Sequence, residues 1–317
     1  GANTSGNFNV AIGDSALISN TTASNNVAIS YAALNVNTTG ANNIAIGYTA
    51  LSSNTTASNN TAVGRAALLA NTTGTRNSSV GTSALEANIT GNYNVAVGYQ
   101  SLKANTAGTH NTALGDTALH ASTANYNTGV GQGAGFSVTT GASNTFVGAL
   151  AGDGTAAGNY NVAVGYLALS AVAGSSNVAL GYASSVDCTG SNNTTVGEFS
   201  GYALTSGTNN LFLGEDAGRT GSPGGNITTG SNDIALGDEN IDTASIQVDW
   251  TVASDARDKT DFTALDLGLD FVKALAPVTY KWDKRSKYGD KSAEGYDLNA
   301  QSPDGTHKED WLDIGFK

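Results

Sequence analysis

Asn43-Ile44-Ala45-Ile46-Gly47 is the stretch that decides the fold, because close copies of it recur along most of the chain. The glycine returns every 17 residues, sometimes 16 and once 23, which gives fourteen units that end near residue 241; Ser30 replaces it once. Each unit holds one alternating segment, an Ala-Leu segment and a turn of the Asn-Thr-Thr-Gly kind. Such a unit is too short to bury a core of its own, so neighbouring units must stack. We therefore expect an all-β parallel β-solenoid or β-roll of about fourteen 17-residue repeats, roughly 65 Å long at the strand spacing.

Three columns of side chains follow from stacking the units. A branched aliphatic residue precedes every glycine, from Ile12 to Leu236, and this column is interpreted as a core stripe. In the first seven units a leucine follows four residues after the glycine, from Leu17 to Leu119. An asparagine stands four residues before it in thirteen units, and its carboxamides are expected to form a hydrogen-bonded ladder, as in cross-β structures. The predicted ladder consists of Asn9, Asn26, Asn43, Asn60, Asn77, Asn94, Asn111, Asn127, Asn144, Asn161, Asn177, Asn193 and Asn210.

The composition excludes several classes of function. Charged residues make up 13% of the 317 residues and the net charge is −12, so no basic stripe is available for a nucleic acid. Cys188 is the only cysteine, which excludes an intrachain disulfide framework. No apolar run approaches the roughly 20 residues of a membrane helix. We expect no cofactor, no metal site and no membrane insertion. The chain has no methionine and begins inside a repeat, so we expect both natural ends to lie outside it.

The repeat resembles the head repeats of YadA-type trimeric autotransporter adhesins, whose signature Asn-x-x-Ala-Ile-Gly ends in the same Ala-Ile-Gly as the stretch Asn43 to Gly47. The resemblance covers about three quarters of the chain. It implies a left-handed parallel β-roll and a homotrimer, with three chains packed around a shared apolar axis. Because the unit of that family is usually shorter, the exact coil geometry is left open.

Several surface features allow two interpretations. The small residues before the leucine column, such as Ala33 and Ser101, suit close approach of coils or subunits, or thin packing inside one coil. Five Asn-x-Thr sequons could accept glycans, although turn chemistry also explains them. They start at Asn20, Asn37, Asn54, Asn71 and Asn88. Aromatic residues beside asparagines could stack on sugars or pack on the turns; these are Phe8, Tyr93, Tyr126 and Tyr160.

A second kind of sequence begins near residue 242. The last 72 residues hold all three tryptophans, 14 of the 26 acidic residues and 10 of the 14 basic residues. Helical spacing predicts a helix over 263–276 that Pro277 ends, followed by a strand over 278–282. We divide the chain into a β-solenoid fibre (1–241), a linker with a cleavage site (242–253) and a partial, small α+β domain (254–317).

Residues 254–259, Ser-Asp-Ala-Arg-Asp-Lys, and the later segments 276–278 and 313–316 resemble the intramolecular chaperone that ends many phage tail spikes, tail fibres and endosialidases. The resemblance implies a domain that drives trimerisation and then cuts itself off between Ala253 and Ser254. Ser254 would be the nucleophile and Lys259 its base, a role that requires a lowered lysine pKa. The alternative interpretation makes Ser254 a turn residue and Lys259 a solvated charge.

Together these features predict a structural, host-attachment fibre of a phage virion, a homotrimer that binds a glycan or protein receptor on the host surface. A prokaryotic cell-surface trimeric adhesin or extracellular filament is the alternative. An ice-binding solenoid is a weaker hypothesis, prompted by the Thr columns. An enzyme acting on an external substrate is the weakest, because no acid pair recurs in the repeats.

Overall fold

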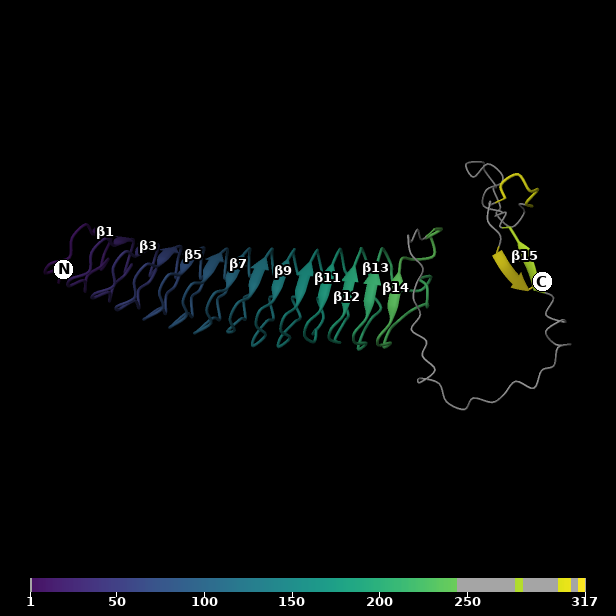
Figure 1. Ribbon diagram of the computed structural model, residues 1–317. Coiled ribbons are helices and arrows are strands. Elements are labelled where there is room, and N and C mark those ends of the chain that lie inside the picture. Colours follow the sequence, from purple (N-terminus) through teal and green to yellow (C-terminus); the bar gives the residue numbers. More distant parts are fainter. Residues whose placement is uncertain (1, 244–276, 282–301, 309–312, 317) are drawn as a thin grey trace. The chain divides into compact units, whose positions relative to one another are not determined.

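The computed structural model describes residues 2–243, 277–281, 302–308 and 313–316. Contacts between residues divide the chain into two units, Gly1–Ser245 and Ile246–Lys317. The first unit is a stack of coils whose strands lie side by side, as Figure 1 shows for β1 to β14. In the described part of the chain there is no helix.

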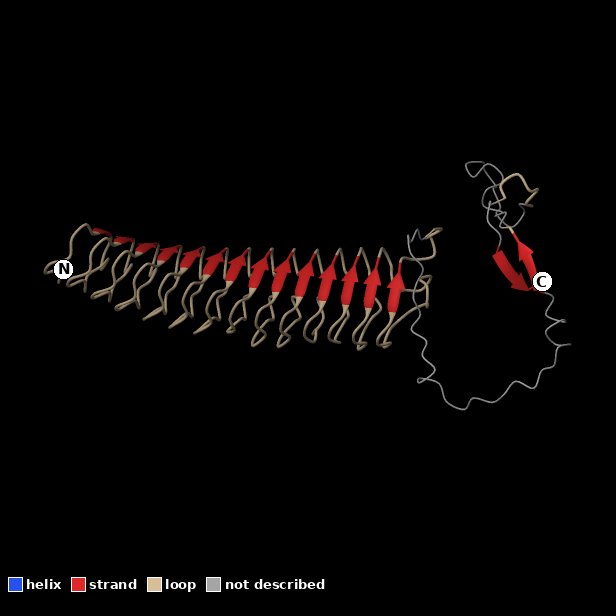
Figure 2. Ribbon diagram, in the orientation of Figure 1, coloured by secondary structure: helices blue, strands red, loops and turns tan. Residues whose placement is uncertain are grey.

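Each coil contributes one strand of three residues to a single sheet. The fourteen strands are parallel and follow the order of the chain, each paired with the next coil in register, as Val27 pairs with Ile44. In Figure 2 they form one continuous wall of the stack, and turns make the rest of each coil. The all-β solenoid predicted from the 17-residue spacing is confirmed. The strands are β1 (Val10–Ile12), β2 (Val27–Ile29), β3 (Ile44–Ile46), β4 (Thr61–Val63), β5 (Ser78–Val80), β6 (Val95–Val97), β7 (Thr112–Leu114), β8 (Thr128–Val130), β9 (Thr145–Val147), β10 (Val162–Val164), β11 (Val178–Leu180), β12 (Thr194–Val196), β13 (Leu211–Leu213) and β14 (Ile234–Leu236).

The glycine of the motif is required by close approach of successive coils. Gly47 has a φ of +137°, and a Cβ there would lie 2.5 Å from the carbonyl oxygen of Gly64 in the next coil. Both the backbone conformation and the contact therefore disfavour any side chain. Further corners use left-handed residues, such as Asn42 at +58° and Leu51 at +50°. The recurring glycine is thus a condition for stacking at strand spacing.

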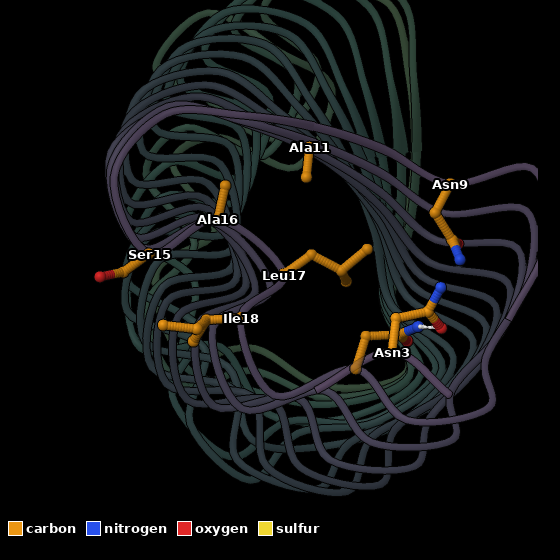
Figure 3. Close-up of a pocket in the computed structure, with 8 residues that line it drawn as sticks. Asn3, Asn9, Ala11, Ser15, Ala16, Leu17 and Ile18 are labelled. Carbon is orange, nitrogen blue, oxygen red and sulfur yellow. Dashed lines mark hydrogen bonds between the residues drawn. The ribbon is translucent and has the colours of Figure 1, made fainter. Parts of the chain in front are cut away.

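The interior of the coil is filled by the middle residue of each strand and by the leucine column. Ala45, Ala50 and Leu51 are 0% exposed. Figure 3 shows this arrangement in the first coil, where Ala11, Ala16 and Leu17 point inward. Because β1 pairs only with β2 in the described chain, the interior is open at this end and forms a pocket. The small residues before the leucines thus pack inside one coil.

The aliphatic residue before the glycine does not form a core stripe, contrary to the interpretation from the sequence. Ile46 is 37% exposed and Val97 is 38% exposed, and no member of this column is buried within the chain. The cause is strand alternation, which sends the middle residue inward and both flanking residues outward. Since the leucine occupies the interior, only alanine or another residue of matching size fits beside it. The aliphatic columns therefore line the outer face of the sheet.

In two coils the interior is filled by a different set of side chains. Phe146 and Phe212 replace the central alanine and are fully buried. The leucine position becomes glycine on both sides of Phe146, at Gly135 and Gly152. A Cβ on Gly152 would lie 2.3 Å from the Phe146 ring. One large residue with two glycines thus replaces one small residue with two leucines, which keeps the interior close-packed.

The second unit contains a two-stranded antiparallel ladder, β15 (Pro277–Tyr280) and β16 (Asp313–Phe316), in which Val278 pairs with Gly315. The strand expected after Pro277 is confirmed as far as Tyr280. The helix predicted over 263–276 lies outside the described residues. No helix in the described part is long and apolar enough to cross a membrane.

Candidate functional site

Two columns of asparagine run through the interior of the rod. In the first, the predicted ladder from Asn9 to Asn210, each Oδ1 accepts the backbone N–H of the equivalent residue in the next coil. The Asn43 N–H donates to Asn26 Oδ1 at 2.9 Å, and Asn43 Nδ2 donates to the Ala57 carbonyl at 2.8 Å. The series continues to Asp233 N–H on Asn210 Oδ1. The carboxamides therefore bond mainly to backbone groups and thereby fix the spacing of the coils.

The second column contains the asparagines of the sequons, which sequence reasoning assigned to turns. Here carboxamide bonds to carboxamide: Asn54 Nδ2 donates to Asn37 Oδ1 at 2.8 Å, and Asn71 Nδ2 donates to Asn54 Oδ1 at 3.0 Å. Asn37, Asn54, Asn71 and Asn88 are all 0% exposed. An oligosaccharide cannot be attached to these side chains in the folded rod. The signal in the sequence was the uninterrupted 17-residue spacing of this asparagine over seven units.

The second column ends at Asn105, whose Oδ1 is buried without a hydrogen-bond partner in the described chain. The next coil has 16 residues and places Ser122 at the equivalent position. Beyond it the interior position is taken by Val138, Thr155, Cys188 and Leu204, all 0% exposed. This second interior column therefore changes from asparagine to mostly apolar residues, whereas the first asparagine column continues to Asn210.

The outer face of the sheet carries two columns without a single charge. One consists of the residues that begin the strands, such as Val27 and Thr61, and the other of the branched aliphatics that end them. Members of the second column that are exposed include Ile46, Val97 and Leu213, at 37–38%. The second column is aliphatic in every coil, and an exposed apolar stripe of this length is typical of interaction surfaces.

Aromatic residues form exposed stacks along one corner of the coils, directly before the first asparagine column. The Arg76 guanidinium lies 5.2 Å from the Tyr93 ring centroid. The ring centroids of Tyr93 and His110 are 4.8 Å apart, and those of His110 and Tyr126 are 5.1 Å apart. The following coil has Ser143 at this corner and the one after it has Tyr160. Of the aromatic residues singled out from the sequence, Tyr93 and Tyr126 thus belong to one stack, whereas Tyr160 stands apart.

The pKa values of Cys188 and His120, two side chains of the rod, are shifted from their usual range. Burial raises the pKa of the Cys188 thiol, which also receives a hydrogen bond from Asn193 Nδ2 at 3.4 Å. Burial and the Lys103 ammonium lower the pKa of His120, whose ring stacks on Phe136 at 5.0 Å. A neutral thiol is a poor nucleophile, so Cys188 is a packing residue. In the described part of the chain, no cluster of His, Cys, Asp or Glu could hold a metal ion.

The expected cleavage site, Ala253 and Ser254, and the expected base Lys259 lie outside the described residues. The β15–β16 ladder pairs Pro277 and Val278 of one further segment of the resemblance with Phe316 and Gly315 of the other.

Residues 254–301 match the family model for the chaperone of endosialidase. This match supports the resemblance drawn from the Ser-Asp-Ala-Arg-Asp-Lys stretch and contains strand β15. No significant similarity was found to a curated protein or to a solved structure. The likeness of the coils to autotransporter head repeats remains a prediction.

Proposed function

We propose that the chain is part of a homotrimeric tail fibre of a phage, which attaches the virion to its host and is trimerised by its C-terminal chaperone segment. The observation that carries the proposal is the match of residues 254–301 to the endosialidase chaperone, directly after a solenoid rod. A chaperone of this kind suggests a protein of the tail-fibre or tail-spike type. The rod supplies length and a repetitive surface, as an attachment fibre requires.

The uncharged outer face of the sheet supports the trimer. Its aliphatic column extends over all fourteen coils, and leaving it in water is unfavourable by about 25 cal/mol for each Å² of apolar surface. Three copies of this face around one axis would cover it along the whole rod.

Maturation by one self-cleavage is the second part of the proposal. Neutral Lys259 would take the proton of the Ser254 hydroxyl while Oγ attacks the Ala253 carbonyl carbon. The Ala253–Ser254 C–N bond then breaks, the nitrogen takes a proton, and water hydrolyses the resulting ester to release the rod. The proposed nucleophile and base stand five residues apart in the stretch that resembles the chaperone.

A prokaryotic cell-surface adhesin is the second candidate, because the coils resemble autotransporter head repeats through the stretch Asn43 to Gly47. The same trimeric rod would then extend from a cell rather than from a virion. Expression from the natural gene distinguishes the two candidates: immunogold labelling on the phage tail supports the fibre, and labelling on the cell envelope supports the adhesin.

The assembly is tested by measuring the mass and oligomeric state of the mature protein. We expect a trimer whose chains end at Ala253, and an uncut trimer for Ser254→Ala, with Ser245→Ala as the matched control that is still cut. Cutting at the same bond in Ser254→Ala would refute the assignment. Val97→Lys should convert the trimer to monomers by placing a charge in the aliphatic column. Thr56→Lys, at an exposed turn residue, should leave the trimer intact; a Val97→Lys trimer would contradict the shared axis.

A further inference from the structure

The corner of the coils that carries the aromatic stack has a one-coil gap. Arg76, Tyr93, His110 and Tyr126 occupy it in four consecutive coils; Ser143 follows, then Tyr160. All the residues from Tyr93 to Tyr160 at this corner have φ values of 59–61°. Since the backbone has the same conformation in each coil, the side chains leave it in the same direction. Ser143 therefore stands where a ring would continue the stack.

The coils on both sides of the gap keep their register. The Ser143 N–H donates to the Asn125 carbonyl at 3.1 Å, and the Tyr160 N–H donates to the Ala142 carbonyl at 3.2 Å. Adjacent rings in this column lie 4.8–5.1 Å apart, which is the spacing of one coil. Two coils therefore separate the Tyr126 and Tyr160 rings by roughly 9.6 Å. This spacing leaves room for one further ring between Tyr126 and Tyr160, beside Ser143, and we call this position the slot.

The exposed fractions of the tyrosine side chains are larger where no neighbouring ring covers a ring face. Tyr93, stacked between Arg76 and His110, is 44% exposed, whereas Tyr126 is 59% exposed and Tyr160 is 67% exposed. Tyr160 has a serine on both sides, because Ser176 occupies the corner in the following coil. An exposed aromatic face offers an apolar surface for stacking beside the polar phenol tip.

Two hydrogen-bonding groups lie at the coil of the gap, the Ser143 hydroxyl and the Asn159 carboxamide that reaches back to Ala142, whereas the Asn125 carboxamide reaches back to the coil of His110. Asn125 and Asn159 precede the two tyrosines. Asn159 Oδ1 accepts the Ala142 N–H at 2.8 Å, and Asn125 Oδ1 accepts the Thr109 N–H at 2.7 Å. Each carboxamide is thereby held by its oxygen, and within the described residues neither Nδ2 group donates a hydrogen bond. In contrast, Nδ2 of Asn92, two coils before Asn125, donates to the Thr90 carbonyl. The Ser143 hydroxyl likewise makes no hydrogen bond within the described chain.

The chemistry of the slot selects the class of ligand. Two aromatic faces accept a ring with apolar C–H groups on both sides, and the free Asn159 amide beside the free Ser143 hydroxyl suits a rim of hydroxyl groups. The corner residues from Asn125 to Ser176 include no charged side chain, which disfavours an acidic sugar. A planar aromatic side chain would fill the same width but would leave the Asn159 amide and the Ser143 hydroxyl without partners.

We propose that the slot between Tyr126 and Tyr160 is a subsite for one neutral pyranose unit of a glycan. The subsite rests on the proposed host-attachment function and names the chemistry of its receptor. The slot is formed by a single chain, so a trimer would present three copies and gain avidity from their simultaneous use.

The test uses saturation-transfer NMR on the complete chain with four methyl pyranosides, those of glucose, galactose, mannose and N-acetylglucosamine, and with N-acetyltyrosinamide as the aromatic probe. We expect at least one pyranoside to bind in the millimolar range, and more strongly than the aromatic probe. Ser143→Tyr fills the slot with the residue that this corner already carries in other coils, so the rod should keep its thermal midpoint. It should bind the pyranoside at least tenfold more weakly.

Ser176→Tyr is the matched control, because it adds a ring to the outer face of Tyr160 and leaves the slot open. Binding should be retained. Unchanged binding in Ser143→Tyr, binding by none of the four pyranosides, or preference for the aromatic probe would each overturn the subsite. These results are separate from the fibre itself: a monomeric or uncut chain would still contain the slot, and a trimer without pyranoside binding would refute only the subsite.

Discussion

Replacing Asn54 by aspartate tests the buried carboxamide ladder, because the two side chains have the same shape. Asn54 Nδ2 donates to Asn37 Oδ1 at 2.8 Å and to the Ala57 carbonyl at 3.0 Å, and both groups are buried. A carboxylate donates to neither. Asn37 Oδ1 then has no donor, whereas the Ala57 carbonyl keeps its bond from Asn43 Nδ2. A buried acceptor left unpaired costs about 1–3 kcal/mol, so Asn54→Asp should destabilise the local structure by about that amount. The local opening constant would rise by about 5-fold to 150-fold.

Hydrogen exchange followed by mass spectrometry is the suitable assay, because a stack of coils can open locally and need not unfold in one step. The amides of the coils around Asn54 should lose protection at pH 7. Burial and two facing oxygens raise the pKa of the new carboxyl above its unfolded value. Its protonated form, which can donate one hydrogen bond, is favoured in the folded rod. Protection should therefore be largest below about pH 4 and fall as the pH rises through the folded pKa.

Asn59→Asp is the control, since Asn59 is an exposed residue of the same coil with a φ of +64° that aspartate also tolerates. Its effect should stay within about 0.5 kcal/mol. If Asn54→Asp changes exchange no more than Asn59→Asp, the ladder does not stabilise the rod and the reasoning fails.

Two further predictions concern the interior. Phe146→Ala should cost about 3–5 kcal/mol by opening a cavity, and adding Gly152→Leu should recover part of it in denaturant titrations; an additive loss would argue against the exchange of volume between these positions. Cys188, which is 0% exposed, should react with a thiol reagent only after denaturation, as an absorbance assay would show, and rapid labelling of the native rod would contradict its placement.

The sequence predicted the coil length and the strand positions because the glycine column has a strict steric cause. It did not predict which face of the strand is buried. Ile44-Ala45-Ile46 alternates equally well in either orientation, and the deciding quantity is the volume left beside Leu51 inside a narrow coil. The aliphatic column was therefore assigned to the core, although it is the central alanine that is buried.

The second asparagine column was missed for a related reason. Asn-Thr-Thr-Gly is ordinary turn chemistry, and a turn residue is expected at the surface. In a solenoid the turns of successive coils also stack, so a side chain that points inward at one turn meets its own copy one coil away. Asn37 and Asn54 show this at 2.8 Å. Only the repeat period, and not the local pattern, carries that information.

The ladder and the proposed sugar subsite meet at Asn144, the residue after Ser143. Asn144 Oδ1 accepts the Asn161 N–H at 2.9 Å, and its Nδ2 donates to the Gly158 carbonyl at 2.9 Å. These bonds fix the spacing between the coil of Ser143 and the coil of Tyr160, and hence the width of the slot. Asn144→Ala leaves both groups unpaired without removing any atom that faces the sugar.

Asn144→Ala should therefore weaken pyranoside binding severalfold while sedimentation shows an unchanged assembly. Asn43→Ala breaks the equivalent bonds far along the stack and should destabilise its own coils without affecting binding. Saturation-transfer titrations of the two variants measure the difference in pyranoside binding. Equal binding by both would mean that the ladder does not position the subsite, whereas a loss confined to Asn144→Ala would show that a buried amide sets the geometry of an exposed one-sugar slot.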